Sequence, residues 1–282
     1  MTLRLVTINF WGIEAPLDRR LALAIRQLRG LAPDVIAMQE VRPLDGASGR
    51  TTADELAAAL GMHAHYEQAV SWQAGEHGAL PAGQEGLALI TRKPLRAVER
   101  LALPEPRPGD ARILLSGEVD THAGPIWVHT THLHYRLDDG VARERQVAAV
   151  DAAIRLRRTD TSAPQLLCGD FNATPDSDEI RFLRGLHTLD GRRTHFQDAW
   201  MRAHGDARGT TWSSENELTR PLRSLDIDRR IDFIFVTSRK KDGRGTVKDC
   251  RIVLDERDAG LCASDHYGLQ ADIQIEAGQN PV

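Results

Sequence analysis

The sequence predicts an α+β fold in which one β-sheet packs against another, and three observations lead to this prediction. Short alternating or continuously apolar segments, which are typical of strands, recur along most of the chain. Few segments have the apolar spacing of an amphipathic helix, so helices and strands do not alternate strictly. The 282 residues, 41% of them hydrophobic, are enough to enclose a substantial core. Two sheets packed face to face accommodate these elements best.

In the first part of the chain, the periodicity predicts two strands and two helices. Residues 2–9 alternate as a half-buried strand does, and apolar residues recur at helical spacing over 17–31. The apolar run 35–38 predicts a short buried strand. A second helix is expected over 51–60, because Gly61 directly after it is a typical helix stop.

The rest of the chain predicts mainly short strands, with a long helix over 141–157 and a short one over 177–184. The polar, glycine-bearing stretch 71–85 predicts a loop. The predicted strands cover 86–91, 113–119, 125–131, 165–168, 231–236, 250–254 and 267–275. Because the sequence has no fixed-period repeat and no low-complexity tract, we expect one domain over 2–276 and a short tail over 277–282.

Composition and charge argue against several classes of protein. No apolar run is long enough for a transmembrane helix, and the N-terminus lacks the pattern of a signal peptide, so a cytoplasmic protein is expected. The three cysteines show no Cys-x-x-Cys spacing, which argues against a disulfide framework or a thiolate zinc site. The net charge of -4 gives no global attraction to nucleic acid, so a nuclease would need a local basic face.

Polar side chains stand at the ends of several predicted strands. They are Asn9, Gln39-Glu40, Thr131-His132, Asp170 with Asn172, and Asp265-His266 directly ahead of the last strand. Strand ends that present carboxylates, amides and imidazoles predict a site assembled from loops on a rigid scaffold. Carboxylate oxygen is the ligand that magnesium prefers, so Glu40, after four apolar residues, is expected to bind a metal ion.

Six motifs, in this order, resemble those of the endonuclease/exonuclease/phosphatase superfamily. They are Thr-Ile-Asn-Phe-Trp at 7–11, Gln-Glu at 39–40, Thr-His-Leu at 131–133, Gly-Asp-Phe-Asn at 169–172, Arg-Ile-Asp-Phe-Ile at 230–234 and Ser-Asp-His at 264–266. Any one of them alone is weak, since Gln-Glu or Ser-Asp-His occurs often by chance, but six in order over nearly the whole chain are specific. The resemblance implies a four-layer α/β/β/α sandwich of two mixed sheets flanked by helices. It also implies a Mg²⁺-dependent hydrolase of phosphate esters, with Mn²⁺ as a substitute.

The resemblance also implies roles for the acidic and amide residues of the site. Glu40 and Asp265 are expected to bind the metal ion. Asn9 is expected either to bind the ion as well or to hold the carboxylates around it. Asp170 is expected to orient or deprotonate the attacking water, and Asn172 to contact the phosphate.

Two histidines are expected to face the phosphate. Asp265 and His266 are adjacent, so on an extended backbone they point in opposite directions and should not simply pair. The resemblance instead makes Asp232 the partner of His266. His132 is the second imidazole, and His134 shares its face if the strand continues, which makes His134 a candidate for substrate contact at the rim.

Two further residues, Arg112 and Trp212, are candidates for substrate binding, although Trp212 also suits simple packing. The function expected is phosphodiester hydrolysis by in-line attack of water, in a monomer. A DNase-like or exonuclease-type enzyme on DNA or RNA, a sphingomyelinase-like phospholipid hydrolase and a small-molecule phosphatase remain alternatives. The runs 9–12 and 167–172 look most like the sphingomyelinase branch. A non-catalytic binding module is disfavoured because every central motif residue is present, and a zinc enzyme because there is no His-Glu-x-x-His.

Overall fold

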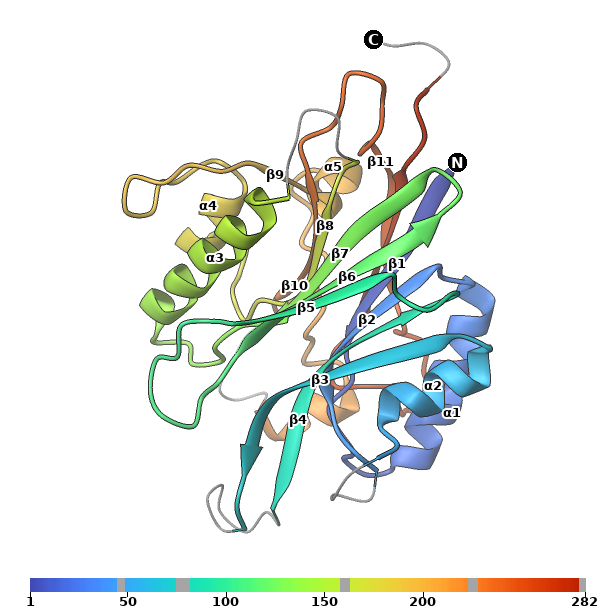
Figure 1. The fold of residues 1–282 in the computed structure, drawn as a ribbon. Helices are drawn as coiled ribbons and strands as arrows, with labels where there is room; N and C mark the ends of the chain where they lie inside the picture. Colours follow the sequence, from blue (N-terminus) through green and yellow to red (C-terminus); the bar gives the residue numbers. More distant parts are fainter. Residues whose placement is uncertain (45–48, 75–81, 158–162, 223–227, 279–282) are drawn as a thin grey trace.

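The computed structural model describes residues 1–44, 49–74, 82–157, 163–222 and 228–278. Within these residues, the strands form two six-stranded sheets that pack face to face, with helices on their outer faces (Figure 1). The predicted four-layer sandwich of two mixed sheets flanked by helices is therefore confirmed. The prediction of one domain over 2–276 stays a prediction, and residues 279–282 of the predicted tail lie outside the described residues.

Each sheet combines strands from distant parts of the chain. The first sheet contains β1 (Thr2–Asn9), β2 (Val35–Val41), β3 (His63–Trp72), β4 (Gly83–Thr91), β11 (Val247–Val253) and β12 (Gly268–Gln274), in the order β11-β12-β1-β2-β4-β3. The second contains β5 (Ala97–Ala102), β6 (Ile113–Thr121), β7 (Gly124–His132), β8 (Leu166–Asp170), β9 (Phe196–Asp198) and β10 (Asp232–Thr237), in the order β5-β6-β7-β8-β10-β9. The helices are α1 (Leu17–Leu31), α2 (Thr52–Leu60), α3 (Gly140–Arg155), α4 (Asp178–Leu183), α5 (Ala199–His204) and a 3₁₀ helix at Glu217–Leu222.

Side-chain alternation along each strand decides which layer of the core a residue enters. In β1, Leu5 packs between the two sheets, whereas Ile8 packs against α1 and α2 on the outer face of the first sheet. In β8, Cys168 enters the layer between the sheets and Leu167 packs toward α3 and α4. The apolar residues therefore form three layers of contact, one between the sheets and one under each pair of helices.

The predicted elements agree with the structure where the periodicity is strong, and they fail where an element is largely exposed or very short. The first strand and the first helix have the predicted bounds. The strands β3, β5 and β9 and the helix α5 were not predicted, and the predicted loop 71–85 begins and ends inside β3 and β4, with 75–81 outside the described residues. β3 and β5 are largely half-buried or exposed, so they lack the apolar run that marks a core strand. Among the described helices, none is long and apolar enough to cross a membrane.

Arg20 of α1 is fully buried and joins two loops that carry predicted site residues. Its Nε donates to the carbonyl of Ala263 at 3.1 Å, and its Nη2 donates to the carbonyl of Phe10. Burial lowers the pKa of Arg20 to about 10. Because Phe10 follows Asn9 and Ala263 lies two residues before Asp265, this guanidinium fixes the backbone on two sides of the predicted site.

Candidate active site

Alternation places polar residues from both sheets at one end of the space between them. Asn9 continues the inner-facing series of Leu3 and Leu5 in β1. The inner-facing series of β2, β7, β8 and β10 carry a polar residue at the same rim: Gln39, His132, Asp170 and Asp232. Register agrees with this placement, because Asp170 lies opposite both His132 and Asp232 in the second sheet.

Glu40 reaches the same rim through a distortion of β2. Gln39 points between the sheets, so strict alternation would send Glu40 to the helix side. The register between β2 and β4 shifts between Met38 and Val41, and Glu40 has a φ of 54°. Such a bulge with a left-handed residue re-aims a side chain. As a result, Glu40 Oε1 accepts a hydrogen bond from Asn9 Nδ2 at 2.9 Å.

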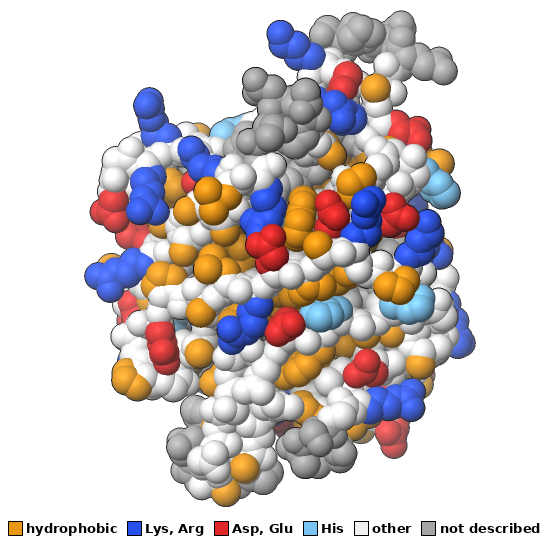
Figure 2. Space-filling view, viewed as in Figure 1, with side chains coloured by type: hydrophobic (Ala, Val, Ile, Leu, Met, Phe, Trp, Pro, Cys, Tyr) orange, Lys and Arg blue, Asp and Glu red, His pale blue; other side chains and the backbone are white. Residues whose placement is uncertain are grey.

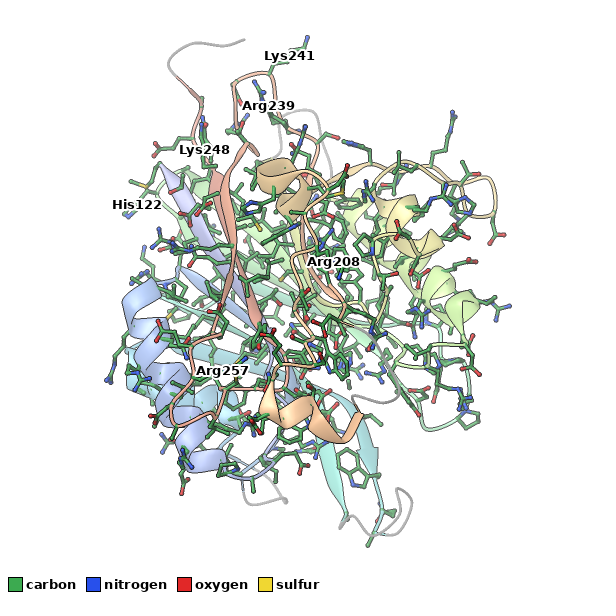
Figure 3. All side chains as sticks on the ribbon, turned by 180° about the vertical axis from the view of Figure 1, so that it is seen from behind. His122, Arg208, Arg239, Lys241, Lys248 and Arg257 are labelled. Carbon is green, nitrogen blue, oxygen red and sulfur yellow. The ribbon has the colours of Figure 1, made fainter. Side chains whose placement is uncertain are left out.

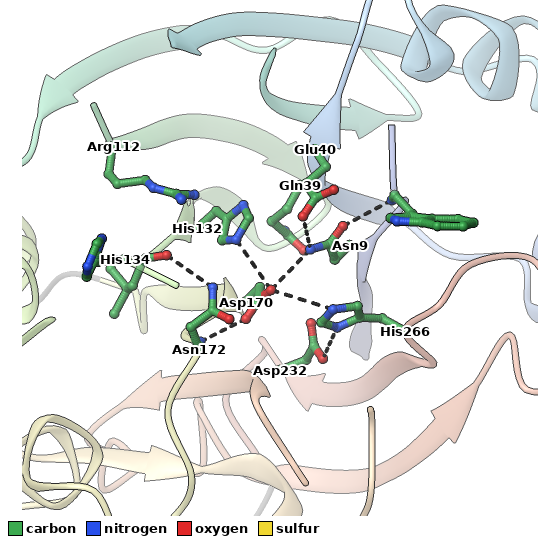
Figure 4. Close-up of polar contacts among 12 residues, drawn as sticks. Asn9, Gln39, Glu40, Arg112, His132, His134, Asp170, Asn172, Asp232 and His266 are labelled. Atoms are coloured by element: carbon green, nitrogen blue, oxygen red, sulfur yellow. Dashed lines mark hydrogen bonds and ion pairs between the residues drawn. The ribbon is translucent and has the colours of Figure 1, made fainter. Parts of the chain in front are cut away.

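Asp170 stands at the centre of the cluster (Figure 4). Its Oδ2 accepts a hydrogen bond from Asn9 Nδ2 at 3.1 Å and lies 3.5 Å from His132 Nε2 and 3.8 Å from His266 Nε2. Its Oδ1 accepts from the backbone N–H of Asn172 at 2.8 Å, in an Asx-turn that fixes the carboxylate. Burial raises the pKa of Asp170 to about 6. One carboxylate oxygen from β8 therefore faces an amide and two imidazoles.

His266 and Asp232 form a buried ion pair. His266 Nδ1 lies 2.9 Å from Asp232 Oδ2, and the backbone N–H of Asp232 donates to Thr211 Oγ1 at 3.2 Å. Burial alone would lower the pKa of His266. The charge of Asp232 and its hydrogen bond, together with Asp265 and Asp170, raise that pKa well above its usual value. These charges therefore favour the cationic form of His266.

His132 has the opposite protonation state. Burial lowers its pKa well below the usual value, and the positive charges of Arg112 and His266 lower it further. The site thus combines one neutral and one cationic imidazole on either side of Asp170. Pairs of groups whose environments separate their pKa values are typical of acid–base sites.

The acidic groups of the site suit a hard divalent cation. Burial, then the charges of Glu85 and Asp265, raise the pKa of Glu40 to about 8. A cation between these carboxylates would relieve their repulsion and their desolvation, and oxygen ligands are those that Mg²⁺ binds. Within the described residues, there are two groups in which one possible ligand atom from each residue lies within 4.8 Å of the others. The first group is Glu40, Glu85 and His132, and the second is Asp170, Asp232 and His266.

The side-chain amide of Asn9 points its nitrogen toward the carboxylates. The backbone N–H of Trp11 donates to Asn9 Oδ1 at 3.0 Å, which leaves Nδ2 to contact Glu40 and Asp170. An amide nitrogen does not ligate a magnesium ion. Of the two roles expected for Asn9, this geometry favours holding the carboxylates.

Glu85 of β4 is a candidate that the sequence analysis missed, since it stood at the end of the predicted loop 71–85. Its Oε2 accepts from Arg42 Nε at 2.9 Å, and its charge raises the pKa of Glu40. The pairing of β4 with β2 is what brings Glu85 close to Glu40. β4 runs antiparallel to β2, so the first residues of β4 lie beside the distorted end of β2 that carries Glu40.

The residues predicted to contact substrate are placed differently from one another. Figure 4 shows the guanidinium of Arg112 turned toward His132 and the ring of His134 turned away from Asp170. The His134 side chain is fully buried, with Nδ1 2.7 Å from Asp110 Oδ2. The structure therefore does not bring His134 into the cluster.

Trp212 lies directly behind the cluster. It forms an isolated β-bridge with His266, and its side chain is buried, with Arg229 Cζ 5.5 Å from the ring centroid. This arrangement matches the packing alternative considered for Trp212, while its contact with substrate stays a prediction.

The comparison with protein families gives the class of the protein. The model of the "Endonuclease/Exonuclease/phosphatase family" matches residues 6–266, and the chain belongs to this family. Members of the family are metal-dependent hydrolases of phosphoester bonds, and this chain is an enzyme of that class. The sphingomyelinase-like branch is not distinguished by this match and stays a prediction.

Solved structures share the fold across almost the whole chain. An endonuclease/exonuclease/phosphatase from Beutenbergia cavernae DSM 12333 is 24% identical, with a TM-score of 0.74, covering 97% of this chain and 72% of that one. D. rerio TDP2 complexed with single strand DNA product is 20% identical, with a TM-score of 0.71, covering 97% of this chain and 99% of that one. The human Nocturnin catalytic domain with bound sulfate anion is 19% identical, with a TM-score of 0.71, covering 98% of this chain and 95% of that one. The comparison with curated proteins gave no match.

Proposed function

We propose that this protein is a Mg²⁺-dependent phosphodiesterase that hydrolyses a P–O bond by in-line attack of water. The observation that supports this most strongly is the convergence of Asn9, His132 and His266 on a single oxygen of Asp170. A carboxylate held in this way can orient a water molecule, and the groups around it can contact a phosphoryl group.

Glu40 and Asp265 would hold the cation, and Asn9 would orient Glu40 toward it. The two carboxylates lie close enough for the charge of Asp265 to raise the pKa of Glu40. When bound, a divalent cation would supply positive charge beside the phosphoryl oxygens. Arg20, which donates to the backbone directly after Asn9 and two residues before Asp265, would hold these two segments in place.

Asp170 would orient the attacking water and accept its proton. With a pKa of about 6, its carboxylate is ionised at neutral pH and its Oδ2 faces the rim. His266, kept cationic by Asp232, would donate from Nε2 to a phosphoryl oxygen. His132, which is neutral, would contact the phosphate by a hydrogen bond, and Asn172 would present its amide to the phosphate.

The distribution of charge favours a small phosphodiester over duplex nucleic acid. Figure 2 shows basic and acidic side chains intermixed across one face, and the sequence has a net charge of -4. Figure 3 shows Arg239, Lys241 and Lys248 at the end of the molecule where the chain termini lie. The N-terminal end of β1 lies at this end of the molecule, and Asn9 stands at its other end. For a strand of eight residues the two ends are roughly 23 Å apart. These basic residues therefore do not line the site.

Hydrolysis of chromogenic esters tests the proposed function. We expect bis-p-nitrophenyl phosphate to be hydrolysed with Mg²⁺ or Mn²⁺, and hydrolysis to stop when EDTA removes the ion. p-Nitrophenyl phosphate should react more slowly, because its second negative charge adds repulsion from the carboxylates of the site. Absence of metal-stimulated hydrolysis of the diester in folded protein would contradict the proposal, and faster turnover of the monoester would point instead to a phosphatase.

Replacing Glu40 with glutamine should weaken the response to metal. Glutamine keeps the size of the side chain and can still accept from Asn9, but it removes one anionic ligand. We expect the Mg²⁺ concentration for half-maximal rate to rise at least about tenfold, a change comparable to the loss of an outer-shell partner. The rate should be measured over a Mg²⁺ titration, with Glu55→Gln on α2 as a control. An unchanged Mg²⁺ dependence would remove Glu40 from the metal site.

A further inference from the structure

Two cavities lie next to each other, and only the inner one touches His132. The inner cavity is lined by His132, Glu85 and Arg112, among others. The outer cavity, which we name the Tyr135 pocket, is lined by Arg42, Trp72, Arg112 and Tyr135, and it shares Glu85 and Arg112 with the inner one. The inner cavity measures only about 10 Å³ and the Tyr135 pocket about 290 Å³, so an ester group of a substrate bound at the Asp170 cluster would reach the pocket by passing over Arg112.

The Tyr135 pocket combines two aromatic rings with two guanidinium groups. Arg42 Cζ lies 5.2 Å from the ring centroid of Trp72, and Arg112 Cζ lies 5.9 Å from that of Tyr135. Each arginine also faces a carboxylate, since Arg42 Nη2 is 2.8 Å from Glu85 and Arg112 Nε is 3.6 Å from Asp110. The pocket therefore offers stacking surfaces, hydrogen-bond donors and hydrogen-bond acceptors together.

We propose that the Tyr135 pocket binds the planar base of a nucleotide-type phosphodiester whose phosphate lies at the Asp170 cluster. This inference rests on the proposed function and names its substrate class. Tyr135 is 56% exposed, so its ring has free surface on which a base can stack. Base–aromatic stacking tolerates any base, and the arginines and carboxylates can contact donors and acceptors on the base edge.

The same geometry argues against a choline phosphodiester, the substrate type suggested by the likeness to the sphingomyelinase branch. A quaternary ammonium group binds to the faces of aromatic rings. Here the guanidinium groups of Arg42 and Arg112 lie 5.2 and 5.9 Å from the ring centroids of Trp72 and Tyr135, so an ammonium group on either ring would stand near a positive charge. A second cation in this pocket would meet like charge, whereas a neutral base would not.

The backbone on both sides of Tyr135 is held in place. The N–H of His134 donates to Gln146 Oε1 at 2.9 Å, and Arg143 Nη1 donates to the carbonyl of Arg136 at 2.5 Å. Both partners belong to α3, which packs on the outer face of the second sheet. The Tyr135 ring is thus presented from a fixed loop, so little backbone entropy is lost when a ligand binds to it.

Calorimetric binding of three phosphate monoesters in the presence of Mg²⁺ tests the inference. Adenosine 5′-monophosphate carries a base, methyl phosphate carries none, and phosphocholine carries a quaternary ammonium group. We expect the nucleotide to bind at least about tenfold more tightly than methyl phosphate, which corresponds to one stacked base. Phosphocholine should show no such gain. Tyr135→Ala should remove the advantage of the nucleotide, whereas Tyr135→Phe, and Leu137→Ala in the same loop, should keep it.

Two results would overturn the inference: equal binding of the nucleotide and methyl phosphate by the unaltered protein, or a nucleotide affinity that Tyr135→Ala leaves unchanged. A gain for phosphocholine would likewise reject a base in favour of a choline group. Because calorimetry measures binding without turnover, its outcome does not depend on whether the proposed hydrolysis occurs. Nucleotide binding lost on Tyr135→Ala, with no hydrolysis of any diester, would reject the proposed function and support the pocket. Hydrolysis of bis-p-nitrophenyl phosphate without a base preference would reject only the pocket.

Discussion

Replacement of Asp170 with asparagine is expected to lower kcat by about 10³- to 10⁴-fold, which is the upper range for loss of a general base. The asparagine can still accept the N–H of Asn172, so the local turn should survive. It cannot accept a proton from water, and its amide nitrogen would face the donor Nδ2 of Asn9 if it replaced Oδ2. The measurement is kcat for bis-p-nitrophenyl phosphate at saturating Mg²⁺.

The matched control is Asp138→Asn, since Asp138 is an exposed aspartate paired with Arg136. That variant should keep its kcat within about twofold. Circular dichroism and thermal melting should show both variants folded. If Asp170→Asn retained more than about a tenth of kcat, Asp170 would not be the group that activates the water.

Loss of His266 is the second large effect expected. His266→Ala should reduce kcat/KM by about 10³-fold, the size of effect seen when a group that stabilises transition-state charge is removed. Asp232→Asn keeps the imidazole but removes the charge that raises its pKa. Because His266 acts in its cationic form, a raised pKa preserves that form as the pH increases. Without Asp232, burial lowers the pKa and the cationic form is lost at a lower pH.

The pH profile of kcat/KM distinguishes these roles. In Asp232→Asn, the alkaline limb of the profile should shift to lower pH, with activity best retained on the acidic side. Asp198→Asn removes a buried carboxylate that pairs with Arg230 and serves as a control for a general loss of packing. An unshifted alkaline limb in Asp232→Asn would show that His266 does not act as a cation.

The fold was predictable where one pattern decides one element. β1 and α1 carry strong periodicity, and both have buried and exposed faces that the sequence separates. β5 is exposed along most of its length, so its sequence lacks the apolar pattern of a strand. Its pairing with β6 is what stabilises it as a strand. Such an edge strand depends on a tertiary partner, and single-sequence periodicity does not report one.

The sequence predicted which residues gather at the rim better than it predicted how they are arranged there. The motifs named Asp170 and His266, and the structure brings both to one rim. Same-face reasoning placed His134 beside His132, but β7 ends at His132, so alternation no longer governs the next residues. Glu85 was missed because its closeness to Glu40 arises only through the pairing of β2 with β4. Contacts of this kind, between residues on paired strands, cannot be predicted from the local sequence.

The backbone of Glu40 has a consequence for how this protein would respond to engineering for heat resistance. A left-handed residue other than glycine costs on the order of 1 kcal/mol, and the desolvation that raises the pKa of the half-buried Glu40 carboxyl to about 8 adds to that cost. Glycine at position 40 should therefore raise the melting temperature. On the proposed role of Glu40, the same change would weaken the response to the metal ion, so stability and turnover would oppose each other at this residue.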